Sequence, residues 1–177
     1  MRSGYIVKEE LTHVLGALMP ANRLICELSL ATGLRVGDVL RLKTEQVQKG
    51  PRMTVHEQKT GKTRTVRLPA DLHRRALQMA GATYVFEGRL NGRKPRSRQA
   101  VYKDLMRAAA LFRLKEHISP HSCRKVWAVR AYQESGGDLK KVQRLLNHDS
   151  EAVTMLYAMA DQLTQRRKGK ITREVDK

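Results

Sequence analysis

Aromatic residues and cysteines are scarce in this 177-residue sequence, which contains one Trp, two Phe and two Cys. A membrane-surface helix usually carries Trp and Phe on its apolar face, so this composition argues against such a helix. The N-terminal stretch "MRSGYIVKEE" lacks the apolar run of about 7–15 residues found in signal peptides. Cys26 and Cys123 form no C-x-x-C pair. We therefore expect a cytoplasmic protein with no membrane partner, in which both cysteines are buried thiols.

Acidic residues are also scarce. Asp and Glu number 17 against 35 Lys and Arg, which leaves a formal net charge of +18 and a sequence pI near 10.5. An excess of this size repels itself unless an anionic partner is near. Polyanions are the commonest such partners, so the charge favours a nucleic acid.

The length fits one domain, because domains cluster at about 100–200 residues. Residues 165–177, "QRRKGKITREVDK", are polar and poor in apolar side chains, unlike the chain before them. The sequence therefore predicts one domain over residues 1–164. A basic tail follows over residues 165–177, which is mobile or contacts a neighbouring protomer.

Apolar residues recur with helical spacing over most of the chain. In the N-terminal part, this spacing predicts helices over residues 7–19, 21–31 and 36–42. Met53 and Val55, then Val66 and Leu68, alternate around a Gly-containing turn, as in a β-hairpin or small three-stranded sheet. Further helices are predicted over residues 71–80, 97–112, 120–134, 138–146 and 150–159. The predicted fold class is mostly α with a small antiparallel β-sheet (α+β).

The segment "SPHSCRK", residues 119–125, has the features of a helix start. Ser119 can cap the helix, and Pro120 suits its first turn. His121 and Arg124 then lie one turn apart on the same side, near the positive end of the helix, where an anion is stabilised. The simpler interpretation is a solvated His and Arg at a helix start.

The same segment raises the question of a metal site, because His117, His121 and Cys123 are close in sequence. Pro120 interrupts the helix between the two histidines, and no second ligand cluster has zinc-like spacing. We therefore expect no metal at these residues.

A second candidate lies in "TGLRVGDVLRL", where Gly33 permits a tight turn and Arg35 opens a short helix with Asp38 one turn later. Arg35 could simply pair with Asp38. A guanidinium oriented by a neighbouring carboxylate is also held rigid for bidentate phosphate binding, and the sequence leaves both interpretations open.

Basic residues also surround the predicted hairpin turn and a later helix start. The segment "QKTGKTR" places Lys59, Lys62 and Arg64 around the turn, where basic side chains are usually only solvated. His148 immediately precedes a predicted helix start at Asp149 or Ser150, so its ring would lie near backbone N–H groups that attract anions.

Tyr157 lies at the border of the apolar face of the last predicted helix. The simplest interpretation is a boundary tyrosine with a solvated hydroxyl. Together with the basic residues above, it has a second interpretation, as the nucleophile that attacks a phosphodiester. A tyrosine hydroxyl ordinarily has a pKa of about 10, so it would need nearby positive charge or a base such as His121. Two guanidiniums could hold the phosphorane oxygens, and a hairpin lysine could protonate the leaving 5′ oxygen.

These residues and their order resemble the tyrosine recombinases, also called phage-type integrases. That family has an Arg in a "TGLR" turn followed by an acidic residue, a Lys at a β-hairpin, a His-x-x-Arg box, a His or Trp in an "LGH"-like turn, and a Tyr nucleophile one helix later. The matching positions are Arg35 with Asp38, Lys59, His121 with Arg124, His148 and Tyr157. The resemblance covers roughly residues 7–161, and separated matches in order are more specific than any single one.

The resemblance implies a tyrosine recombinase catalytic domain that acts on double-stranded DNA. A homotetramer would exchange strands between paired sites through a 3′-phosphotyrosyl intermediate. The scheme needs no cofactor, metal or ATP, and leaves room for accessory DNA-bending proteins and a nucleoid-associated location. Lys59 is preferred over Lys62 as the general acid, since the family's lysine lies on the strand-to-turn side. Because the family's usual N-terminal domain has no counterpart, we expect either an excised catalytic domain or a natural protein of that domain alone.

Two other functions are compatible with the same residues. A type IB topoisomerase has similar catalytic groups but relaxes supercoils as a monomer. A non-catalytic DNA-binding module would use the cations only to neutralise phosphates, and it could not attach covalently to DNA.

Overall fold

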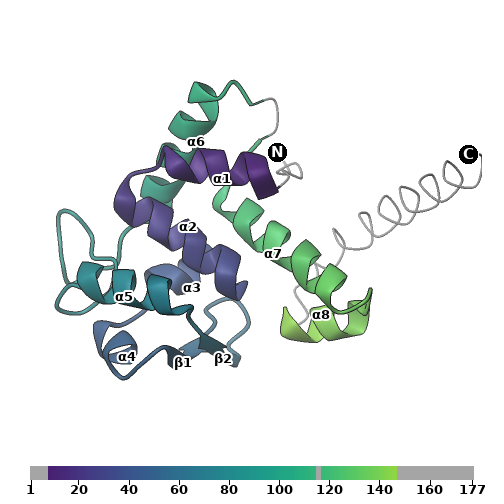
Figure 1. Cartoon of the computed structure of the whole chain (residues 1–177). Coiled ribbons are helices and arrows are strands. Elements are labelled where there is room, and N and C mark those ends of the chain that lie inside the picture. Colours follow the sequence, from purple (N-terminus) through teal and green to yellow (C-terminus); the bar gives the residue numbers. More distant parts are fainter. Residues whose placement is uncertain (1–7, 115–116, 147–177) are drawn as a thin grey trace, which may run out of the picture. The chain divides into compact units, whose positions relative to one another are not determined.

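The computed structural model describes residues 8–114 and 117–146 of the chain. Its elements, in order, are α1 (Lys8–Gly16), α2 (Pro20–Thr32), α3 (Val36–Leu40), α4 (Thr44–Gln48), β1 (Arg52–His56), β2 (Thr63–Arg67), α5 (Ala70–Met79), α6 (Arg98–Leu111), α7 (Pro120–Glu134) and α8 (Leu139–Leu145). The fold is mostly helical with a small antiparallel sheet, which confirms the predicted class (Figure 1). The helix predicted over residues 150–159 lies outside the described residues.

Two details of the described fold differ from the prediction. The short helix α4 has the sequence "TEQVQ", in which Val47 is the single apolar residue, so the sequence shows no helical period there. Within the described ranges the sheet has two strands, so the three-stranded alternative is wrong for this part of the chain. Isolated bridges, Lys43 with Tyr84 and Glu87 with Pro95, occur outside these strands.

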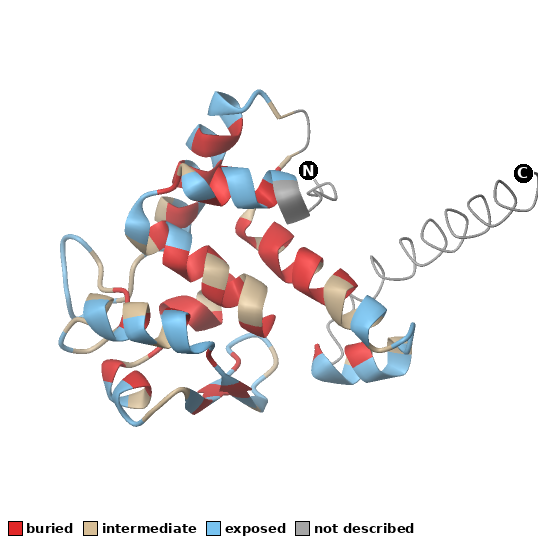
Figure 2. Ribbon diagram, in the orientation of Figure 1, coloured by how far each residue is buried: buried red, intermediate tan, exposed pale blue. Residues whose placement is uncertain are grey.

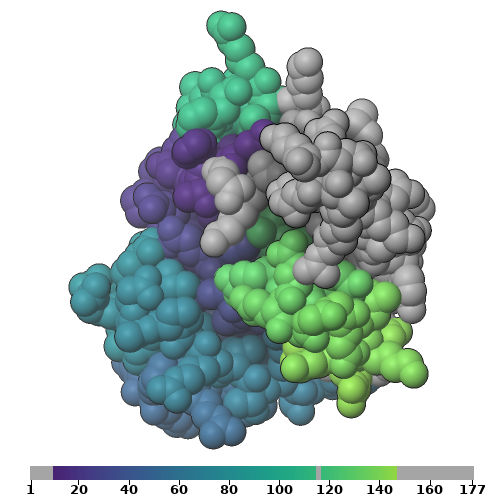
Figure 3. All heavy atoms as spheres, turned by 45° about the vertical axis from the view of Figure 1, so that its right-hand side comes forward, coloured from purple at the N-terminus to yellow at the C-terminus, as the bar shows by residue number. Residues whose placement is uncertain are grey.

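The described residues divide after Trp127 into two compact units. The first contains α1 to α6, the hairpin and the start of α7, and the second contains the end of α7 and α8. In the first unit α2 is the central helix, because it contacts α1, α3, α5 and α6. Buried positions run along α2 in Figure 2, and α6 lies against α1 in the space-filling view (Figure 3).

The hairpin has one buried and one exposed face. Met53 pairs with Val66 and Val55 pairs with Arg64 across the antiparallel strands. Met53, Val55 and Val66 are buried, while their immediate neighbours along the strands are exposed or half-buried. Since side chains alternate between faces in a strand, the period-two pattern of the sequence correctly identified the inner face.

A buried carboxylate joins α2 to α6. Asp104 accepts hydrogen bonds from Asn22 Nδ2 at 2.7 Å and from the Met19 amide at 2.8 Å. Arg107 donates to the same carboxylate at 2.7 Å. Burial acts to raise the pKa of Asp104, but the hydrogen bonds from Asn22, Arg107 and Met19 outweigh it and hold that pKa below its ordinary value.

In the second unit, a two-glycine turn separates α7 from α8. Gly136 and Gly137 have φ of 72° and 93°, values that suit glycine. Asp138 then caps α8 by accepting a hydrogen bond from the Lys141 amide at 2.8 Å. Val142 is the buried residue of this helix, so α8 has a single inward-facing position at its centre.

Cys26 and Cys123 are both buried free thiols, which confirms the prediction. A hydrogen bond with Cys123, together with burial, raises the pKa of the Cys26 thiol. Over residues 8–114 and 117–146, no helix has both the length and the apolar character needed to cross a membrane.

Candidate functional site

The turn that carries Arg35 is built around Gly33. This glycine ends α2 with φ of 68°, and its amide donates to the Ser29 carbonyl at 2.8 Å. A Cβ atom at this position would lie 2.5 Å from the ring of Trp127, so a side chain would collide with the indole as well as strain the backbone. The predicted tight turn at Gly33 is therefore confirmed, and the Trp127 ring is the surface against which it packs.

Arg35 is buried and its guanidinium is held by a carboxylate. Its Nη1 lies 2.7 Å from Oε2 of Glu57, and Glu57 is completely buried. Glu57 follows β1 directly, so the contact joins the turn after α2 to the hairpin. The Arg35 guanidinium is therefore held by the carboxylate of Glu57, a residue that the sequence did not single out.

Asp38 ties the same hairpin to α3 by a different contact. Its Oδ1 accepts a hydrogen bond from the Gln58 amide at 3.0 Å. Burial raises the pKa of Asp38, and neither the Gln58 bond nor the charges of Arg35 and Arg124 fully offset that effect. The role of Asp38 in the fold is thus to fix the first residue of the hairpin tip.

Arg124 approaches the turn from α7, which begins at Pro120 as predicted. Its Nη1 donates to the carbonyl of Gly33, and only 3% of the residue is exposed. Arg35 and Arg124 therefore flank one turn, although 89 positions separate them in the chain (124 − 35). His121 lies one turn before Arg124 and is half-buried.

The hairpin lysines lie at an exposed tip. The tip is closed by hydrogen bonds from the Glu57 amide to the Lys62 carbonyl, at 2.8 Å, and from the Gly61 amide to the Glu57 carbonyl, at 2.9 Å. Lys59 and Lys62 are both exposed. Lys59 directly follows Gln58, whose amide binds Asp38, so its backbone is one residue from a fixed point. The choice between the two lysines stays a prediction.

Sequence reasoning missed two further residues of this site, Glu57 and Trp127, and gave no role to Arg64. Arg64 Nη2 donates to the Thr32 carbonyl at 2.5 Å, and its guanidinium lies 5.2 Å from the centroid of the Trp127 ring. The alternation of inward and outward residues along the strand could have identified Glu57. Glu57 continues the inward series of Met53 and Val55, and a charge on an inner face needs a partner.

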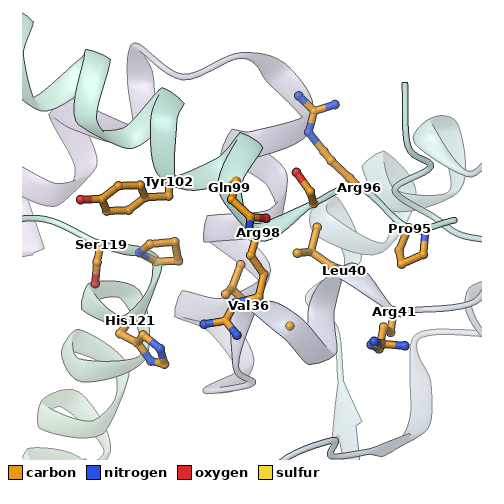
Figure 4. A pocket seen from close by; sticks show the side chains of 13 residues that line it. Val36, Leu40, Arg41, Pro95, Arg96, Arg98, Gln99, Tyr102, Ser119 and His121 are labelled. Atoms are coloured by element: carbon orange, nitrogen blue, oxygen red, sulfur yellow. The ribbon is translucent and has the colours of Figure 1, made fainter. Parts of the chain in front are cut away.

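A pocket of about 510 Å³ lies beside this cluster, between α3 and the starts of α6 and α7. Its lining is basic, with Arg41, Arg96, Arg98 and His121 among its residues. Figure 4 shows Arg98 reaching the pocket from the start of α6 and His121 from the start of α7. Such a pocket suits an anion, because two helix starts and several cationic side chains surround it.

Taken together, the described site holds guanidiniums in fixed positions, two of them buried and one half-buried. Arg35, Arg64 and Arg124 converge on the turn after α2, accompanied by the carboxylates of Glu57 and Asp38. In the described ranges, no group of three His, Cys, Asp or Glu side chains is placed to hold a metal ion. Fixed guanidiniums can stabilise a charged phosphate without a metal. His148 and Tyr157 lie outside the described residues, so their roles stay predictions.

Comparison with known sequences gives a consistent result. The family model described as the Phage integrase family matches residues 6–163. The "Probable integrase/recombinase YoeC" of Bacillus subtilis (strain 168) is 34% identical over 139 residues, which cover 76% of this chain and 75% of that protein. The "Tyrosine recombinase XerD" of Mycobacterium leprae (strain TN) is 30% identical over 159 residues, covering 81% of this chain. The chain spans 49% of that XerD, and thus about half its length.

Solved structures share the fold. The post-cleavage complex of XerH recombinase with its palindromic difH substrate covers 97% of this chain, with a TM-score of 0.74 and 20% identity, and the match spans 54% of that chain. The catalytic core of lambda integrase covers 83% of this chain and 92% of that chain, with a TM-score of 0.66 and 24% identity. At these identities the likeness establishes the tyrosine recombinase catalytic-domain fold and leaves the activity to be argued from the site.

Proposed function

The chain belongs to the phage integrase family, and on that premise we propose that it cuts and rejoins DNA at specific sites through a 3′-phosphotyrosyl intermediate. The observation that carries this proposal is the placement of two buried guanidiniums, Arg35 and Arg124, around one turn. The reaction conserves the phosphodiester energy in the protein–DNA bond, so it requires neither ATP nor a metal ion.

The arginines stabilise the charge that develops at the phosphorus. Attack on a phosphodiester produces a phosphorane with additional negative charge on its non-bridging oxygens. Glu57 holds Arg35 and the Gly33 carbonyl holds Arg124, so neither guanidinium has to reorient as that charge appears. Donors fixed in advance in this way commonly supply a large share of the lowering of a barrier.

Tyr157 supplies the nucleophile in this proposal. Its hydroxyl oxygen forms the bond to phosphorus, and His121 accepts the hydroxyl proton. The bond from phosphorus to the 5′ oxygen breaks, and Lys59 gives that oxygen a proton. His148 binds the same phosphate near a helix start. Rejoining reverses these steps with a 5′ hydroxyl from the partner duplex.

Double-stranded DNA is the proposed partner. The net charge of +18 and the basic pocket beside His121 support it, because DNA binding is dominated by contacts to phosphates. We propose that four protomers assemble on paired sites, with accessory DNA-bending proteins as further partners. A related solved structure is titled as a lambda integrase tetramer bound to a Holliday junction, at 24% identity. We place the activity in the cytoplasm, on the nucleoid.

The domain boundary belongs to the same proposal. Residues 1–164 form the catalytic domain, and residues 165–177 form a basic tail that is mobile or contacts a neighbouring protomer. The family match supports this division, because it ends at residue 163.

The proposal can be tested with a library of nicked duplexes whose sequence is randomised around the nick. A nick next to the cleavage point releases a short strand and traps the covalent intermediate. We expect the wild-type protein to form an SDS-resistant, protease-sensitive adduct with a restricted set of sequences. Tyr157→Phe should bind the captured duplex with unchanged Kd and form no adduct.

Three results would contradict the proposal. An adduct that persists in Tyr157→Phe would exclude this residue as the nucleophile. Relaxation of supercoiled plasmids without regard to sequence would instead indicate a topoisomerase. Binding without any adduct from the wild-type protein would indicate a non-catalytic DNA-binding module.

A further inference from the structure

The inner face of the hairpin ends in two charged residues next to the tip that carries Lys59. Glu57 continues the inward series of β1, and Arg64 belongs to the inward series of β2 with Val66. Glu57 is fully buried, and Arg64 is half-buried. The residue that follows β1 and a residue of β2 therefore each direct a charged side chain towards the core, one before Lys59 and one after it.

Both charged side chains contact the turn that carries Arg35. Glu57 binds the Arg35 guanidinium at 2.7 Å. Arg64 contacts the start of the same turn, at the last residue of α2, since its Nη2 donates to the Thr32 carbonyl at 2.5 Å. The two side chains thus connect the hairpin to that turn from both of its strands.

Arg64 is also packed against an aromatic surface. Its guanidinium lies 5.2 Å from the centroid of the Trp127 ring, the ring that Gly33 approaches closely. Burial lowers the pKa of Arg64, partly opposed by the charge of Glu57, so the folded protein tolerates a desolvated cation here.

The hairpin needs such contacts to fix its tip. It has two strands of five residues each, and a two-stranded hairpin is at best marginally stable on its own in water. A general acid must lie within hydrogen-bond reach of the atom that it protonates. A displacement of about 1 Å in a catalytic group can reduce the rate by about a hundredfold.

We propose that Arg64 is a positioning residue for strand cleavage, which fixes the hairpin tip, and with it Lys59, against the turn that carries Arg35. The inference rests on the proposed function. Arg64 does not touch the phosphate in this scheme. It acts through Lys59, and its loss should therefore impair only the step that Lys59 performs.

The test compares Arg64→Met with Arg67→Met. Methionine keeps the unbranched length of the side chain but removes the donor and the charge. Arg67 lies on the same strand with an exposed side chain, so it controls for the loss of one positive charge. Single-turnover cleavage is measured with saturating DNA on two versions of the captured duplex. One has the ordinary bridging 5′ oxygen, and the other has sulfur at that atom.

Sulfur at the bridging position removes the need for a general acid, because a thiol has a pKa of about 8.5 and leaves readily as a thiolate. We expect Arg64→Met to cleave ordinary DNA at least about tenfold more slowly than the wild type. On the sulfur-substituted duplex it should match the wild type. Arg67→Met should match the wild type on both. The double variant Lys59→Ala/Arg64→Met should be no slower on ordinary DNA than Lys59→Ala alone.

An equal deficit of Arg64→Met on both duplexes would overturn the inference, since Arg64 would then act on the phosphate or on the fold. Additive losses in the double variant would overturn it too. If Arg64→Met fails to fold by circular dichroism, Arg64→Lys takes its place, because lysine keeps one donor for Thr32 but not the planar guanidinium. A smaller deficit with the same sulfur rescue is then expected. Failure of the wild-type protein to form any adduct would instead refute the proposed function, and the inference with it.

Discussion

The arginines and the hairpin lysines of the candidate site differ in burial. Arg35 and Arg124 are 7% and 3% exposed, and each is held by a hydrogen bond to a buried part of the protein. Lys59 and Lys62 lie at the exposed tip of a hairpin. The same positive charge is therefore presented by buried side chains in one group and by exposed side chains in the other.

The difference corresponds to two chemical tasks. A guanidinium remains charged throughout a reaction, so its contribution depends on orientation, and burial fixes that orientation. A general acid must pass its proton to the leaving oxygen, so its side chain has to extend from the protein surface to within hydrogen-bond reach of that atom. The exposed tip suits the second task and the buried turn suits the first.

The largest expected effect comes from removing the carboxylate that holds Arg35. Glu57→Ala should lower the free energy of unfolding by about 3–5 kcal/mol, because truncating one member of a buried ion pair leaves a desolvated charge behind. Urea unfolding followed by circular dichroism measures it. Glu27→Ala is the control, since Glu27 pairs with the more exposed Arg23 and Arg75 at 2.8 and 2.6 Å. It should lose at most about 1 kcal/mol. Equal losses in the two variants would contradict the distinction between buried and exposed cations.

Next in size is the effect of replacing each buried arginine by lysine. Arg35→Lys and Arg124→Lys should each raise the cleavage barrier by about 3 kcal/mol, a rate loss of more than about a hundredfold, because lysine lacks the planar fork. The measurement is single-turnover cleavage at saturating DNA, where a change in affinity has no influence. Wild-type rates in either variant would show that a positive charge alone is sufficient.

A buried carboxylate that plays no part in the proposed chemistry should separate stability from catalysis. Asp104→Asn should cost about 1–3 kcal/mol at pH 7, because it removes a charged acceptor shared by Asn22, Arg107 and the Met19 amide. Cleavage by the folded variant should remain at the wild-type rate.

The pH dependence of that loss has a defined sign. The pKa of Asp104 is lower in the folded protein than its ordinary value of 3.8. Its stabilising contribution is thus complete above that pH and is lost as the pH falls through the folded pKa. Unfolding curves of the wild type and Asp104→Asn should converge below pH 3.8. If the difference in free energy of unfolding between the wild type and Asp104→Asn stayed constant down to the lowest pH, the lowered pKa of Asp104 would be contradicted.

The smallest expected effect concerns the lysines themselves. Lys59→Ala and Lys62→Ala should each change the free energy of unfolding by no more than about 0.5 kcal/mol, because exposed side chains contribute little to stability. The same urea unfolding detects the change. A loss comparable with that of Glu57→Ala would mean that the tip is part of the folded core.

Much of the fold followed from periodicity in the sequence. Helical spacing identified α2, α5, α6 and α7, and alternation identified the hairpin, because these elements are long enough to show their period. The helix α4 was missed, since Val47 is the single apolar residue in "TEQVQ" and one apolar position shows no period. The sheet stops at two strands in the described part of the chain, which depends on tertiary packing that the local pattern does not specify.

For the candidate site, the sequence predicted the local features that position Arg35 and Arg124 but not all of the contacts that these residues make. The turn at Gly33 and the start of α7 follow from local signals, and they bring Arg35 and Arg124 together. The partner of Arg35 could not be read from spacing, because Asp38 is close in sequence whereas Glu57 approaches only through the fold. Trp127 was missed because a tryptophan within a helix is normally read as core.

The measurement that tests the division of tasks most directly is cleavage of ordinary and sulfur-substituted DNA by three variants. Lys59→Ala should be severely slowed on ordinary DNA and largely restored on the sulfur-substituted duplex, while Arg124→Ala should stay slow on both. Lys62→Ala is the comparison within the hairpin, and it should show no rescue. If Arg124→Ala is restored by sulfur and Lys59→Ala is not, the assignment of charge stabilisation to the buried arginines and proton transfer to the exposed lysine is wrong.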